Sequence, residues 1–189
     1  MTASPTDPVA LRRLTSPLGR IEVVGNGTAI VSLAIEREGS LPHDALDERP
    51  DAVTERAVRQ LEEYFAGSRR DFDVPVVLDR GTPFQRAIWD QLVTLRWGEV
   101  AGYGELGAAT GRPGAARAVG GAVGANPVPI IVPCHRVLGS NGVITGYSAG
   151  EGIPTKAWLL DHEGIAHKLT TRRGEPPALI ELPPAEPAA

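Results

Sequence analysis

Residues 82–124 read TPFQRAIWDQLVTLRWGEVAGYGELGAATGRPGAARAVGGAVG, and this segment predicts a series of helices. Its first four residues, TPFQ, form a capping box with proline at the first helical position, so a helix should begin at Thr82. Apolar residues then recur at helical spacing as far as Leu95, which predicts a helix to about Arg96.

Two shorter helices are expected after Trp97 and Gly98, over residues 103–110 and 115–124, with a break at the sequence GRPG. Two short helices joined by a tight turn with glycine predict a helix-turn-helix. Residues 102–107 also match the G-x-G-x-x-G dinucleotide pattern. We reject that interpretation because we expect no strand before the pattern, and because no acidic residue lies between Glu105 and Glu151 to bind a ribose.

The first 80 residues predict a small antiparallel sheet and one helix. The hairpin signal Gly25-Asn26-Gly27 separates two of the expected strands, and Gly67 should end the helix. The expected strands cover residues 11–14, 21–24, 28–35 and 74–78, and the expected helix covers residues 53–65.

A boundary at residues 79–81 divides the chain into an N-terminal sheet-containing domain (1–80) and a C-terminal domain (81–168). The C-terminal domain should be mainly helical, with a last helix over residues 155–163 before Gly164. Residues 169–189 are rich in proline, glutamate and alanine without periodicity and are predicted to be a disordered tail. The fold class is therefore α+β.

Composition suggests a soluble, cytoplasmic protein. The chain of 189 residues has one cysteine and cannot form an internal disulfide, and it has neither a signal peptide nor a run of about 20 apolar residues. The net charge of −4 argues weakly against nucleic-acid binding. However, Arg112, Arg117 and Arg136 lie in the interval without acidic residues, which predicts a locally positive face. The alternative is that a buried, glycine- and alanine-rich segment simply carries few charges.

Cys134 is the candidate reactive residue, within the sequence IIVPCHRV at residues 130–137. A thiolate is the nucleophilic form of cysteine, and a nearby histidine or cation lowers the pKa of the thiol. The alternative is a small apolar side chain packed behind a strand.

Three segments together resemble the O6-alkylguanine-DNA alkyltransferase family. They are NPVPIIVPCHRV at 126–137, GYS at 146–148 and KAWLLDHEG at 156–164. The resemblance covers about Thr82 to Gly164 and is weaker in the first 80 residues. It implies a small sheet-containing N-terminal domain and a helical C-terminal domain with a helix-turn-helix, in agreement with the fold expected above.

The resemblance implies direct reversal of DNA damage, in which Cys134 irreversibly takes the alkyl group from O6 of guanine in duplex DNA, once per molecule. His135 would act on the thiol through a water, and Glu163 would hold the histidine ring. Tyr103 would give a proton to the leaving base, and Asn126 would brace the turn that presents the cysteine.

The resemblance also implies how DNA is held. A helix would lie in the minor groove, the damaged base would be flipped out of the duplex, and Arg117 would fill the gap that it leaves. The small neighbours of Arg117 let the backbone approach DNA; the alternative for Arg117 itself is a solvated helix charge. The implied DNA-binding residues are Ala116, Arg117, Ala118, Gly120 and Arg136, and those implied to bind the base are Val137, Tyr147, Ser148 and Lys156.

The chain departs from the family pattern in one loop. Residues 148–155 are two longer than usual, and Ala149 stands where glycine is typical. No cofactor is expected, and no metal, because the N-terminal part has only His43 and no cysteine. The expected partner is double-stranded DNA containing O6-alkylguanine, with no membrane. The protein should be a monomer in solution; cooperative binding on DNA stays open.

Two alternatives to an alkyltransferase remain. A damage-sensing DNA-binding protein without transfer activity is disfavoured because relatives of that kind lack the cysteine. An ordinary cysteine hydrolase is disfavoured because cysteine and histidine adjacent in sequence are a poor geometric match for that chemistry.

Overall fold

The first half of the chain builds a three-stranded sheet covered by one helix. The structure is a computed structural model that describes residues 9–169, so most of the predicted disordered tail lies outside the described residues. Strands β1 (Ala10–Ser16), β2 (Gly19–Gly25) and β3 (Ile30–Ile35) pair antiparallel in chain order. Leu14 pairs with Ile21 and Val23 with Leu33, so apolar side chains share one face.

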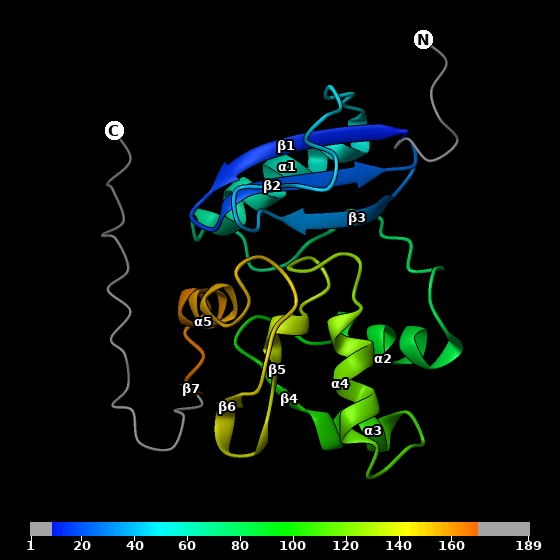
Figure 1. The fold of residues 1–189 in the computed structure, drawn as a ribbon, viewed down its shortest axis with the longest axis vertical. Coiled ribbons are helices and arrows are strands. Elements are labelled where there is room, and N and C mark those ends of the chain that lie inside the picture. The colour runs from blue at the N-terminus through cyan, green and yellow to red at the C-terminus, as the bar shows by residue number, and fades with distance from the viewer. Residues whose placement is uncertain (1–8, 170–189) are drawn as a thin grey trace.

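Helix α1 (Ala52–Phe65) covers that face (Figure 1). The Asp51 and Thr54 side chains cap its first turn reciprocally, and Gly67 ends it with a φ of +74°. Leu61 and Tyr64, both 0% exposed, belong to the stripe that packs toward the core.

Two predictions about strands need correction. The third strand begins at Ile30 and not at Thr28, because the Asn26 side chain accepts the backbone N–H groups of Thr28 and Ala29 and holds a turn. The predicted strand 74–78 is reduced to an isolated bridge between Val76 and Ile30. Pro75 has no N–H to donate, so the segment cannot continue a ladder.

The second half contains the predicted helices, joined by very short strands and turns (Figure 1). Helix α2 stops at Val93, earlier than predicted, because the chain turns at Thr94. The elements are α2 (Pro83–Val93), β4 (Ala101–Gly102), α3 (Tyr103–Ala109), α4 (Ala116–Gly124), η1 (Cys134–Arg136), β5 (Val137–Leu138), η2 (Ser140–Gly142), β6 (Val143–Ile144), α5 (Ile153–His162) and β7 (Lys168–Leu169).

Helices α3 and α4 form the predicted helix-turn-helix. A Cβ atom on Gly107 would lie 2.9 Å from the Arg112 carbonyl oxygen, so only glycine lets α3 approach the turn this closely. The indole of Trp89 donates to the Ala122 carbonyl at 2.8 Å and fastens α4 to α2. Contrary to our expectation, a strand does precede the G-x-G-x-x-G pattern, namely the two-residue β4. The acid-free interval still excludes the ribose-binding carboxylate.

One apolar core runs through both halves, from Ile21 and Leu61 to Ile88 and Leu159. The α+β fold is confirmed. Within residues 9–169, no helix is both long and apolar enough to cross a membrane. The division into domains at residues 79–81 stays a prediction.

Candidate active site

A braced turn presents Cys134. The Asn126 amide donates to the Val132 carbonyl at 2.8 Å, and its side-chain oxygen accepts the Val128 N–H at 3.1 Å. Between these contacts Ile130 has a φ of +72°, an uncommon conformation for a β-branched residue. The turn therefore holds a strained backbone, and the single amide of Asn126 ties both of its ends.

A cavity of about 540 Å³ opens at Cys134, between the helix-turn-helix and the segment 145–148. Its lining includes most of the residues that the sequence singles out. They are Tyr103, Ala116, Arg117, Gly120, Val123, Gly124, Cys134, Thr145, Gly146, Tyr147, Ser148 and Lys156. Among the predicted DNA-contacting and base-binding residues, Ala118, Arg136 and Val137 are not part of this lining.

The Cys134 side chain is buried, with 4% of the residue exposed, and its sulfur lies 4.0 Å from the Tyr147 hydroxyl. Burial raises the pKa of the thiol. Hydrogen bonding by Asn126 and Tyr147 and the charge of Lys156 act in the opposite direction. The resting cysteine is a thiol, so nucleophilic attack requires a base.

His135 has the properties of that base. Its ring is fully buried, and Nε2 lies 2.9 Å from Glu163 Oε1. Burial lowers the pKa of His135, against the attraction of the carboxylate, so the ring is neutral and donates from Nε2. The other nitrogen, Nδ1, has no hydrogen-bond partner among the described residues. Nδ1 is therefore a free acceptor for a proton.

The Glu163 carboxylate accepts hydrogen bonds from three buried residues, namely His135, Arg136 and Tyr64. Arg136 donates from Nε at 2.7 Å and from Nη2 at 2.8 Å, and the Tyr64 hydroxyl donates at 2.9 Å. Burial alone would raise the pKa of Glu163, but the hydrogen bonds and charges of His135 and Arg136 outweigh it and lower the pKa to about 2. The carboxylate stays ionised and fixes the His135 ring.

Arg136, which the resemblance assigns to DNA binding, lies inside the fold, and that assignment stays a prediction. Arg136 is 4% exposed, and its Nη1 donates to the Leu95 carbonyl at 2.7 Å. A guanidinium that is buried and holds a carboxylate with two of its nitrogens is oriented toward the interior of the protein. Arg136 supports Glu163 from within the fold.

Lys156 is a buried cation in the cavity wall. It is 1% exposed, its ammonium donates to the Val137 carbonyl at 2.5 Å, and it lies 5.9 Å from the centre of the Tyr147 ring. Burial lowers its pKa to about 8. The contact occupies the Val137 carbonyl, and Val137 as a whole residue is 0% exposed, so its role in binding the base stays a prediction.

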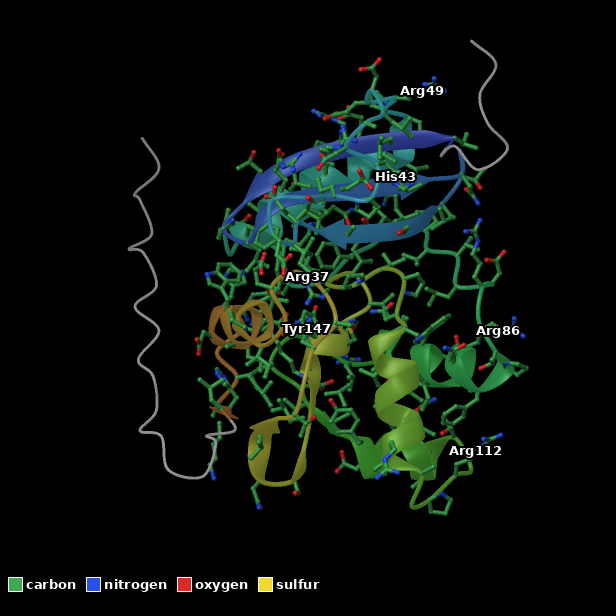
Figure 2. The ribbon with its side chains drawn as sticks, in the orientation of Figure 1. Arg37, His43, Arg49, Arg86, Arg112 and Tyr147 are labelled. Carbon is green, nitrogen blue, oxygen red and sulfur yellow. The ribbon has the colours of Figure 1, made fainter. Side chains whose placement is uncertain are left out.

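The remaining predicted residues surround the cavity mouth. Arg117 is exposed there on α4, with Ala116 and Gly120 on the same wall. The Tyr103 hydroxyl accepts a hydrogen bond from Thr145 at 3.2 Å, which leaves its own proton free to be donated. The Ser148 hydroxyl donates to the Gly124 carbonyl at 2.6 Å and ties the loop to α4. Figure 2 shows Tyr147 at the junction of the sheet and the helical half.

Sequence reasoning missed Tyr64 and Thr145. Tyr64 belongs to the apolar stripe of α1 and gives no sign that its hydroxyl reaches Glu163, which lies 99 residues away in the chain. Thr145 has no motif of its own. Only the folded chain brings these hydroxyls to the site.

Comparison with known proteins places both halves of the chain in one family. Residues 83–165 match the family profile described as "6-O-methylguanine DNA methyltransferase, DNA binding domain". Residues 12–78 match the profile "6-O-methylguanine DNA methyltransferase, ribonuclease-like domain". The two matches together span most of the described residues.

Curated relatives carry the name methylated-DNA–protein-cysteine methyltransferase. The protein of Mycobacterium tuberculosis is 43% identical over 152 residues, which are 80% of this chain and 90% of that protein. The protein of Salmonella typhimurium is 53% identical over 105 residues, 56% of this chain and 60% of that protein. The crystal structure of M. tuberculosis OGT in complex with DNA superimposes with a TM-score of 0.72 at 45% identity and covers 82% of this chain and 92% of that one.

Proposed function

Because the chain belongs to the 6-O-methylguanine DNA methyltransferase family, we propose that Cys134 is the residue that takes the alkyl group from O6 of guanine. The protein is a methylated-DNA–protein-cysteine methyltransferase that repairs DNA by direct reversal, and DNA is its partner. One observation carries the assignment to Cys134. The only cysteine of the chain lies in a cavity beside the helix-turn-helix, and the next residue, His135, is hydrogen-bonded to Glu163.

The proposed reaction begins with proton transfer. His135 Nδ1 accepts the thiol proton through a bridging water, and Glu163 stabilises the imidazolium that forms. The sulfur then attacks the saturated carbon on O6, so that a carbon–sulfur bond forms and the carbon–oxygen bond breaks. The electron pair stays on guanine. Tyr103, whose hydroxyl accepts from Thr145, donates its proton to the departing base.

The product explains why the protein acts once. A thioether has no easy route to hydrolysis, so Cys134 stays alkylated after a single transfer.

The backbone N–H of Ser148, at the cavity wall, would assist the transfer by binding the guanine oxygen.

We propose that α4 enters the minor groove and that Arg117 takes the place of the flipped base. Ala116 and Gly120 let the helix approach DNA closely, because they add almost no side chain beside the arginine. A monomer suffices for this contact. The cytoplasmic location stays a prediction.

Stoichiometry tests the proposed function. Duplex DNA carrying a labelled methyl group on guanine O6 is added in excess, and the label bound to protein is counted. We expect a plateau near one methyl per protein molecule. Continued release of label as a small molecule would indicate a hydrolase, and DNA binding without protein-bound label would indicate a damage sensor.

The substitution Arg117→Ala should slow transfer from duplex DNA by at least about tenfold, because unstacking the damaged base costs a few kcal/mol that the arginine offsets. Transfer from free O6-benzylguanine should stay unchanged, since no base needs to be flipped. The rate constants on both substrates are measured by protein-bound label. Arg86→Ala is the matched control: it removes the same charge from α2, away from the cavity (Figure 2), and should change neither rate. If Arg117→Ala lowered the rate constants on both substrates equally, the proposed role of Arg117 would be contradicted.

A further inference from the structure

The loop that leaves the cavity wall is attached to the N-terminal half. The Glu151 carboxylate accepts the backbone N–H of Glu38 at 2.7 Å, across 113 residues of chain. Glu151 lies in the segment 148–155, which begins at the cavity wall with Ser148. We name this contact the Glu38–Glu151 latch.

The N-terminal side of the latch is a rigid turn. Arg37 and Ser40 exchange both of their backbone hydrogen bonds, at 3.1 and 2.9 Å, and so enclose Glu38 and Gly39. Both enclosed residues have positive φ, +50° and +76°, as a type I′ turn requires. Neither of the two closing hydrogen bonds uses the Glu38 N–H, which is thus available to Glu151.

The turn lies at the junction of the sheet and the helical half. Figure 2 shows Arg37, the first residue of the turn, and Tyr147, a residue of the cavity wall, both at the junction of the sheet and the helical half.

The loop side of the latch is packed as well as hydrogen-bonded. Gly150 is buried with a φ of +53°, and a Cβ atom there would lie 3.0 Å from Ile35 at the end of β3. The Glu151 N–H donates to the Thr155 hydroxyl at 3.0 Å, which ties the loop to the start of α5. Residues 150–151 therefore contact β3, the turn and α5 at once.

The other end of this loop forms the cavity wall. Tyr147 and Ser148 line the cavity, and the Tyr147 hydroxyl lies 4.0 Å from the Cys134 sulfur. Only Ala149 separates Ser148 from the packed Gly150. Because the connection is this short, a displacement of the wall would be transmitted to residues 150–151.

We propose that Glu151 is a positioning residue: through its contact with Glu38 it holds the Tyr147–Ser148 wall in place and thereby sets which alkyl groups the cavity accepts. The inference rests on the proposed function. When the latch holds residues 147–148 in place, the cavity keeps a small alkyl group close to the sulfur and leaves little room for a bulky one. Without the latch, residues 147–148 can be displaced, so the cavity positions the methyl group less well and admits a larger group more easily.

The test compares transfer from duplexes that carry O6-methylguanine or O6-benzylguanine. In Glu151→Ala the ratio of the methyl to the benzyl rate constant should fall about fivefold, the effect expected from losing one solvent-exposed hydrogen bond of ordinary strength. Glu151→Gln keeps a side-chain acceptor and should restore the ratio to within about twofold of wild type. Glu38→Gly is the matched control, because it keeps the N–H and tolerates positive φ, and its ratio should equal that of wild type.

Hydrogen exchange gives a second measurement that does not depend on activity. The Glu38 amide should lose protection in Glu151→Ala and keep it in Glu151→Gln. An unchanged substrate ratio in Glu151→Ala, or an equal loss of both rates, would overturn the proposal. Absence of label transfer in the wild-type protein would instead refute the proposed function, so the two failures can be told apart.

Discussion

Replacing Glu163 with glutamine is expected to cost about 3 kcal/mol of folding stability and to slow methyl transfer by about 100-fold. The carboxylate accepts hydrogen bonds from Arg136, His135 and Tyr64 in a buried site. An amide cannot neutralise Arg136, and its NH₂ group would face one of these donors. The substitution leaves a buried cation without a partner, which is among the most destabilising single changes.

The two effects are measured separately. Urea unfolding gives the stability, and single-turnover label transfer at a temperature where the variant is folded gives the rate. Tyr64→Phe is the graded control, because it removes one neutral donor from the carboxylate and should cost about 2 kcal/mol, less than the loss of the charge itself. Glu62→Gln, an exposed change on α1, should alter neither quantity. A Glu163→Gln protein as stable as the wild type would contradict the role of the carboxylate in the fold.

The same carboxylate predicts the response to acid. The pKa of Glu163 is lowered from its ordinary value of 4.5 to about 2 in the folded protein. Its contribution to stability is therefore complete above about pH 4.5 and is lost as the pH falls toward 2. Glu163→Gln should lose this part of the pH dependence.

Replacing Cys134 with serine is expected to abolish protein-bound label while leaving lesion binding intact. The serine hydroxyl is close in size to the thiol, so the cavity keeps its shape. However, a hydroxyl is far less acidic and less nucleophilic than a thiol, and His135 cannot generate enough alkoxide to displace a guanine from a saturated carbon.

Two measurements on the Cys134→Ser protein separate chemistry from binding. Fluorescence anisotropy with a duplex containing O6-methylguanine should give an affinity close to that of wild type, and the bound lesion should persist. Label on the Cys134→Ser protein at a rate comparable with wild type would require another acceptor and would contradict the account.

Local sequence patterns predict most of the elements. The capping box at 82–85 predicts the start of α2, and α2 begins at Pro83. The stripe through Leu61 and Tyr64 predicts α1 to within one residue, and Gly67 predicts its end. The predicted strand 74–78 is wrong because Pro75 removes a ladder donor, a local fact that the apolar pattern concealed.

Partners distant in the chain are what a single sequence cannot provide. An arginine in a stretch without acidic residues suggests a free positive charge, yet Arg136 pairs with Glu163, which lies 27 residues away. Tyr64 reaches the same carboxylate from the other half of the chain. The resemblance suggests which residues surround Cys134, and their roles stay predictions until the variants above are measured.

The mass of the peptide that carries Cys134 tests the central claim most directly. Protein is mixed with an equal amount of duplex containing O6-methylguanine, digested, and analysed by tandem mass spectrometry. The account predicts one added methyl group, located on the Cys134 sulfur, in the same molar amount as the guanine restored in the DNA. Loss of the lesion with an unmodified Cys134, or with the methyl group on another residue, would contradict it.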